Sequence, residues 1–155
     1  MGIIESTRLN YRVMTLADLD DVIQTENQVY PNPWGRGVFV DCLQGNYECW
    51  VVSRGEQTLG HGVLSVAAGE SHLLNLCIRQ DFQGEGLGRG FLQHLLDRAQ
   101  LCGASVMFLE VRVQNQVALR LYDSMGFAQL GVRKDYYQGE SGREDALVFG
   151  LNLDE

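Results

Sequence analysis

Lysine, proline and long hydrophobic runs are scarce in this chain of 155 residues, and these shortages exclude several protein classes. Lys134 is the only lysine, so no lysine follows a glycine-rich run and a loop for nucleoside triphosphates is absent. No apolar stretch approaches the roughly 18 residues of a membrane helix. The first residues also lack the apolar segment of a signal peptide. We therefore expect a cytoplasmic protein that does not span a membrane.

Positive charge is also in short supply. The chain carries 20 acidic and 12 basic residues, for a formal net charge of −8 that is spread evenly over its two halves. The overall field of such a chain does not attract nucleic acid or anionic lipid. We expect no nucleic acid and no membrane among its partners, and a basic protein or an amine fits better.

Cysteine and histidine form no recognisable metal or disulfide motif. The cysteines lack C-x-x-C spacing, and three of the four have apolar neighbours, as small buried side chains do. The three histidines lack H-x-x-x-H spacing. We expect reduced thiols and no bound metal. These residues are Cys42, Cys49, Cys77, Cys102, His61, His72 and His94.

Length and composition favour one globular domain. Apolar residues make up 45% and charged residues 21% of the chain, close to globular averages. A chain of this length encloses one sizeable core, and no linker or internal repeat divides it. We expect a single domain over residues 1–155.

Hydrophobic periodicity divides the chain into helical and extended segments. The pattern predicts strands at residues 9–14, 48–53, 58–67, 71–78, 106–111, 129–137 and 145–152. It predicts helices at residues 15–30, around 38–43, at 87–102 and at 116–125. Thr15 is the expected N-cap of the first helix, and Gly103 ends the third. This order is typical of a mixed α/β (α+β) fold whose one parallel step crosses over through the 87–102 helix.

The most unusual segment is a glycine-rich loop at residues 83–90, between a predicted strand and a predicted helix. Backbone N–H groups at a helix start lack helical partners and attract anions. Glycines let an anion approach those groups and permit positive φ angles. A flexible turn with helix-packing glycines is the alternative. A dinucleotide-binding G-x-G-x-x-G motif would need glycine at Arg89 or Phe91, so it is excluded.

Two motifs resemble those of the GCN5-related N-acetyltransferase (GNAT) family. Gln83, Gly86 and Gly88 fit the pattern Q/R-x-x-G-x-G/A. Residues 109–127 contain a strand, Asn115, a helix and the pattern Tyr-x-x-x-Gly-Phe. Within the family, the segments at 33–34, 75–78, 109–112, 136–137 and 142–146 resemble the ribosomal-protein-alanine N-acetyltransferases. The resemblance covers about residues 10–152.

This resemblance implies a mostly antiparallel sheet of about seven strands flanked by about four helices, with acetyl-CoA as the co-substrate. The pyrophosphate would bind the amides of residues 83–88, and the pantetheine arm would lie along residues 76–78. Relatives usually place a basic residue in the loop, so we expect Glu85 to point to solvent and Arg79 and Arg89 to supply positive charge. The implied cofactor-binding residues are Leu76, Cys77, Ile78, Gln83, Gly84, Glu85, Gly86, Leu87, Gly88, Arg89 and Asn115.

The resemblance also implies two catalytic residues. Glu110 lies in an otherwise apolar strand and is either a structural carboxylate or a general base; the resemblance favours the base. Tyr122 lies on the apolar face of a helix and is either a core residue or the general acid, which the resemblance favours. Asn115 is an expected N-cap that also contacts the cofactor by resemblance.

For the acceptor, Trp34, Tyr136 and Tyr137 are either ordinary aromatics or, by resemblance, the lining of a peptide cleft. Glu26, Asp135, Glu144 and Asp145 are candidates for an acidic lining. The implied function is acetylation of the N-terminal alanine of a small-subunit ribosomal protein, with the N-terminal segment of that basic protein as partner. The alternatives are an acetyltransferase for lysine or a small-molecule amine, and a non-catalytic acyl-CoA-binding regulatory module. We expect a monomer.

Overall fold

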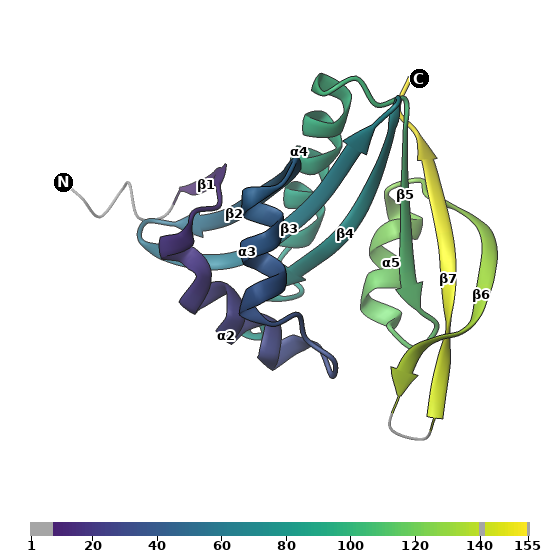
Figure 1. The fold of residues 1–155 in the computed structure, drawn as a ribbon, viewed down its shortest axis with the longest axis horizontal. Helices are drawn as coiled ribbons and strands as arrows, with labels where there is room; N and C mark the ends of the chain where they lie inside the picture. Colours follow the sequence, from purple (N-terminus) through teal and green to yellow (C-terminus); the bar gives the residue numbers. More distant parts are fainter. Residues whose placement is uncertain (1–7, 140–141, 155) are drawn as a thin grey trace.

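The computed structural model describes residues 8–139 and 142–154. One sheet of seven strands runs through it in the order β1-β2-β3-β4-β5-β7-β6 (Figure 1). The strands are β1 (Leu9–Val13), β2 (Tyr47–Arg54), β3 (Gln57–Ala67), β4 (Glu70–Ile78), β5 (Val106–Arg112), β6 (Ala128–Gly139) and β7 (Gly142–Asn152). The expected mixed and mostly antiparallel fold is confirmed.

The four predicted helices are also present. They are α2 (Leu19–Val29), α3 (Arg36–Gln44), α4 (Leu87–Leu101) and α5 (Gln116–Ser124). The first predicted helix is split, because a 3-10 turn at η1 (Leu16–Asp18) precedes α2. Asp18 accepts the Thr15 N–H at 2.8 Å and pairs with Arg12 at 2.7 Å, which fixes this tight entry. A second 3-10 turn, η2 (Gln80–Phe82), follows β4.

Helices cover both faces of the sheet. Figure 1 shows α2 and α3 on one face of the sheet. The core on this face includes Val22, Phe39 and Val63. On the other face α4 and α5 enclose a larger core that includes Phe91 and Tyr122. Burial of these apolar side chains is the main stabilising contribution to the fold.

The sheet opens between its two halves. Among the described strand pairs only β4 and β5 are parallel, and their pairing covers Glu70–Leu73 against Val106–Leu109. Beyond these residues both strands continue unpaired with each other, to Ile78 and Arg112, and Figure 1 shows them diverging. Helix α4 lies between these two parallel strands in the chain, which confirms the predicted crossover through the third helix.

The far edge of the sheet is irregular. Strand β7 begins at Gly142, three residues before the predicted strand. The register of β6 against β7 shifts between Arg133 and Tyr137, where Asp135 has a φ of 55°. This bulge turns the strand and places the aromatic pair Tyr136 and Tyr137 beside the open gap.

All four cysteines are free, as expected, with Cys102 exposed and the other three buried. In the described ranges no helix combines the length and apolar character that crossing a membrane requires.

Candidate active site

A cleft of about 1110 Å³ occupies the place where β4 and β5 separate. Its walls come from both strands, the glycine-rich loop, the start of α5, the segment between α2 and α3, and β6. The predicted site residues that line it are Trp34, Leu76, Cys77, Ile78, Gln83, Gly84, Gly86, Gly88, Arg89, Glu110, Asn115, Tyr122, Tyr136 and Tyr137. Two predicted residues lie elsewhere: Glu85 is exposed outside the lining, and the side chain of Leu87 is buried in the core.

The glycine-rich loop presents backbone N–H groups to the cleft. Gly84 and Gly86 have φ angles of +82° and +83°, and a Cβ at either position would meet only open space. The first intrahelical bond of α4 runs from Gly90 N to Gly86 O at 3.2 Å. The N–H groups of the first turn, at residues 87–89, therefore lack intrahelical acceptors. A helix start with free N–H groups of this kind can bind an anion.

Side chains anchor the loop. The Gln83 side-chain amide donates to the Ile78 carbonyl at 3.0 Å, which ties the loop to the end of β4. Arg89 lines the cleft and donates to Ser124 Oγ at 2.9 Å. Arg79 pairs instead with Asp81 at 3.1 Å and lies outside the cleft lining, so its expected role in the loop is not supported.

Glu110 extends from β5 into the cleft. Its Oε2 is buried and has no hydrogen-bond partner among residues 8–139 and 142–154. The Arg133 guanidinium lies 3.4 Å from that oxygen as a half-exposed ion-pair partner. One carboxylate oxygen is therefore available to accept a proton from a bound amine.

The buried phenol of Tyr122 and the half-buried phenol of Tyr137 accompany this carboxylate. Burial raises the pKa of Tyr122 above its ordinary value, and the nearby Tyr137 adds to the effect. Burial and then the charge of Glu110 raise the pKa of Tyr137 to about 12. The Tyr122 phenol therefore stays protonated at neutral pH. A thiolate formed beside it would meet the same desolvation and become more basic, so proton donation remains reasonable.

Asn115 caps α5, as expected, because its Oδ1 accepts the Ala118 N–H at 3.2 Å. This bond satisfies one of the free donors at the helix start and fixes the turn between β5 and α5. Asn115 also lines the cleft, close in sequence to Glu110 and Tyr122.

Aromatic side chains also line the cleft, and the part that Trp34, Tyr136 and Tyr137 line is called its aromatic end. The rings of Tyr136 and Tyr137 meet edge to face with centroids 5.0 Å apart. Arg112 stacks on Tyr137 at 4.4 Å and donates to Glu144 at 2.7 Å. Trp34 is half-buried against Phe39, with centroids 5.4 Å apart.

The expected acidic lining is only partly present in the cleft. Glu144 is paired with Arg112, and Asp145 Oδ1 accepts the Asp135 N–H at 2.9 Å. Of the four candidate acids only Glu26 and Glu144 line the cleft, and Glu26 is almost fully buried. The pairing of Glu144 with Arg112 and the burial of Glu26 are tertiary features that composition does not reveal.

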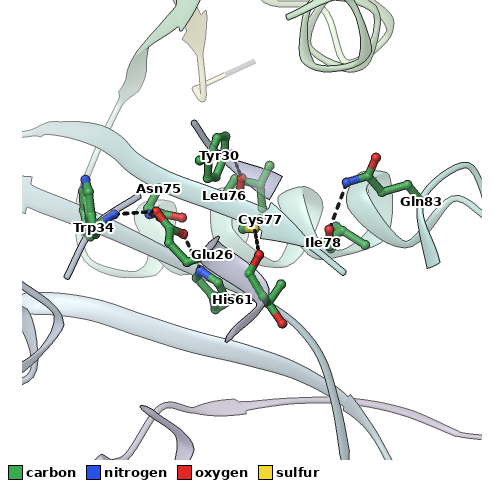
Figure 2. Close-up of polar contacts among 10 residues, drawn as sticks. Glu26, Tyr30, Trp34, His61, Asn75, Leu76, Cys77, Ile78 and Gln83 are labelled. Atoms are coloured by element: carbon green, nitrogen blue, oxygen red, sulfur yellow. Dashed lines mark hydrogen bonds and ion pairs between the residues drawn. The ribbon is translucent and has the colours of Figure 1, made fainter. Parts of the chain in front are cut away.

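A buried network around Glu26 went unnoticed at the level of sequence. Figure 2 shows Glu26 between His61, Asn75 and the backbone of Trp34, with Tyr30 donating to the Leu76 carbonyl nearby. The signal was available in part, because Glu26 follows the buried residues Leu19 and Val22 at helical spacing. The side-chain atoms of Glu26, His61 and Cys77 that could bind a metal ion lie within 4.8 Å of one another. The Glu26 carboxylate, however, already accepts hydrogen bonds from His61 and Asn75.

Comparison with known proteins identifies the family of this chain. Residues 19–127 match the acetyltransferase (GNAT) family. The chain belongs to this family. It is therefore an acetyl-CoA-dependent N-acetyltransferase, and the glycine-rich loop with its free amides fits the diphosphate of that co-substrate.

The acetyltransferase resembles named proteins over nearly its whole length. It is 31% identical over 136 residues to ribosomal protein bS18-alanine N-acetyltransferase of Escherichia coli (strain K12), covering 88% of this chain and 92% of that relative. The crystal structure of ribosomal-protein-S18-alanine N-acetyltransferase from Escherichia coli superposes with a TM-score of 0.88 at 28% identity, covering 96% of both chains. Arabidopsis thaliana NAA60 in complex with acetyl-CoA shares the fold, with a TM-score of 0.85 at 15% identity, covering 96% of this chain and 100% of that one.

The geometry of the loop predicts how a methyl group at Gly86 affects this acetyltransferase. Gly86→Ala should weaken acetyl-CoA binding about tenfold or more, because the methyl group enters the space above the helix start. Gly103→Ala is the matched control, since Gly103 has a φ of +94°, open space around it and a place outside the cleft. Both variants bear a backbone strain of about 1–2 kcal/mol. Isothermal titration calorimetry with acetyl-CoA compares them, and equal affinities would show that the loop is only a turn.

Proposed function

We propose that this acetyltransferase transfers the acetyl group of acetyl-CoA to the α-amino group of a protein, namely the N-terminal alanine of a small-subunit ribosomal protein. The observation that carries the proposal is that the glycine-rich loop, Glu110, Tyr122 and the aromatic side chains all line one cleft. Similarity to the Escherichia coli alanine N-acetyltransferase over 88% of the chain supports the acceptor.

Acetyl-CoA supplies the activated acetyl group, and main-chain groups of this protein would hold it. The N–H groups at the start of α4 suit the diphosphate, with Arg89 as a nearby cation. The unpaired edge of β4 at residues 76–78 suits the amides of the pantetheine arm. Leu87 contributes through its backbone alone, because its side chain is in the core.

Glu110 and Tyr122 divide the proton transfers. Glu110 Oε2 is free of hydrogen bonds and accepts the proton that an attacking ammonium must lose. The Tyr122 hydroxyl, kept protonated by burial, donates a proton to the sulfur that leaves. Arg133, paired with Glu110 in the free protein, gives way to the incoming ammonium group.

An α-amine suits this modest base better than a lysine does. The α-amino group has an ordinary pKa of about 7.7–8.0, whereas lysine has about 10.4, so far more of the α-amine is neutral near pH 7.5. Trp34, Tyr136 and Tyr137 would pack the first residues of an extended peptide. Because Glu144 is already paired with Arg112, recognition rests mainly on these aromatics. Cytoplasmic location and a monomeric state stay predictions.

Glu110→Gln should lower turnover by roughly 10²-fold or more at pH 7, as the loss of a general base does. The deficit should shrink at higher pH, where the amine loses its proton to solvent. Glu48→Gln, a paired strand glutamate outside the cleft, is the control and should keep the rate. A steady-state pH profile measures both variants. Full activity of Glu110→Gln at pH 7 would remove the base assignment, and a wild-type protein that binds acetyl-CoA without turnover would be the non-catalytic module.

Tyr122→Phe should slow the chemical step by about 10- to 100-fold, because it removes the proton donor for the leaving sulfur. Tyr11→Phe removes the hydroxyl of a tyrosine that packs on Phe91 and His94 of α4 outside the cleft lining, and it should have no such effect. Single-turnover kinetics with acetyl-CoA in excess isolates this step. Equal rates for both variants would mean that Tyr122 serves only in the core.

The acceptor is tested with two peptides and one polyamine. A peptide that begins with alanine and also contains lysine should be acetylated only at its N-terminus, as located by mass spectrometry. The same peptide with a blocked N-terminus should not react. Acetyl on the lysine side chain, or preference for the polyamine, would overturn the acceptor while leaving the acetyltransferase in place.

A further inference from the structure

Glu26 is the most deeply buried carboxylate beside the cleft, and the mechanism above does not use it. It lies in the last turn of α2 with 1% of its surface exposed. Its side chain nevertheless contributes to the cleft lining. A buried carboxylate requires partners for both of its oxygens, so its contacts show what it holds together.

Those contacts join three parts of the chain (Figure 2). Glu26 Oε1 accepts hydrogen bonds from His61 Nε2 on β3 at 2.9 Å and from Asn75 Nδ2 on β4 at 3.1 Å. Glu26 Oε2 accepts the backbone N–H of Trp34 at 3.1 Å. The segment at residues 30–35, which we call the acceptor segment, is thereby bound to the sheet.

The main chain strengthens the same connection. The Tyr30 N–H donates to the Glu26 carbonyl at 3.0 Å and ends α2. The Tyr30 hydroxyl donates to the Leu76 carbonyl on β4. The acceptor segment is therefore fixed at both of its ends, at Tyr30 and at Trp34, with Glu26 taking part in both bonds.

The network around Glu26 does not maximise the stability of the fold. His61 Nδ1 and Asn75 Oδ1 are buried and have no hydrogen-bond partner in the described part of the chain. Unpaired buried polar atoms lower stability, and apolar side chains would fill this site with less cost. The arrangement is better explained by the geometry that it imposes on Trp34 and on β4 where they line the cleft.

We propose that Glu26 is a positioning residue for the acceptor peptide. It sets Trp34 at the aromatic end of the cleft through the Trp34 backbone, and it touches neither acetyl-CoA nor the reacting atoms. This inference rests on the proposed function, because the acceptor segment binds the N-terminal peptide there. Loss of the carboxylate then weakens peptide binding and leaves the glycine-rich loop intact.

Glu26→Ala should raise the KM for the alanine peptide about tenfold or more, with kcat and the KM for acetyl-CoA changed less than about threefold. Glu26→Gln should restore most of the peptide KM, because its carbonyl still accepts the Trp34 N–H and its amide can donate to His61. Should Glu26→Ala not fold, Glu26→Met fills a similar volume without an acceptor and gives the same readout.

Asp18→Ala is the matched control, because Asp18 is also a buried carboxylate that binds a backbone N–H, at Thr15, outside the cleft lining. It should lower thermal stability without a selective rise in peptide KM. An equal rise in that variant, a rise in the KM for acetyl-CoA, or no rescue by Glu26→Gln would overturn the positioning role.

Failure of the proposed function has a different signature. A wild-type protein that ignores the alanine peptide but acetylates a lysine peptide or a polyamine overturns the acceptor, and the same variants are then measured with that amine. A selective rise in its KM supports the role of Glu26, and an unchanged KM overturns it.

Discussion

The end of the parallel pairing between β4 and β5 is the constraint on which the site depends. The two strands are held together at Glu70–Leu73 and Val106–Leu109, where the Ser71 hydroxyl also donates to the Val106 carbonyl at 2.7 Å. Past this point the edges of both strands lack their neighbour, and a cleft occupies the gap. Since α4 and α5 each follow one of these strands, both helices begin at the open end. The polar edge and two helix starts thus converge on one place, as happens at the carboxyl ends of parallel strands.

This arrangement explains how a protein with a net charge of −8 can hold an anionic co-substrate. Backbone N–H groups at the start of α4 supply partial positive charge, which the formal net charge does not include. The charged side chains that line the cleft balance in sign, with Glu26, Glu110 and Glu144 against Arg89, Arg112 and Arg120. The cleft therefore has little net field of its own, and aromatic surfaces are left to recognise the acceptor.

Much of the fold was predictable because local patterns determine it. Turn residues and periodicity located the seven strands and four α-helices of the described residues but not the two 3-10 turns, and the glycine spacing located the loop. The Glu26 network was not predictable, because its partners lie 35 and 49 residues away in sequence. The acidic lining was overestimated for a related reason, since only the folded chain brings Arg112 to Glu144. Leu87 was included by its place in the motif, whereas its side chain follows the apolar face of α4 into the core.

Backbone hydrogen exchange with and without coenzyme A tests the central claim most directly, because the claim concerns main-chain groups. The account predicts that coenzyme A slows exchange at the amides of residues 84–89 and at the gap-facing amides of residues 74–78, with little change in β1 and β2. Protection confined to other segments, or none at the loop and the edge of β4, would contradict it.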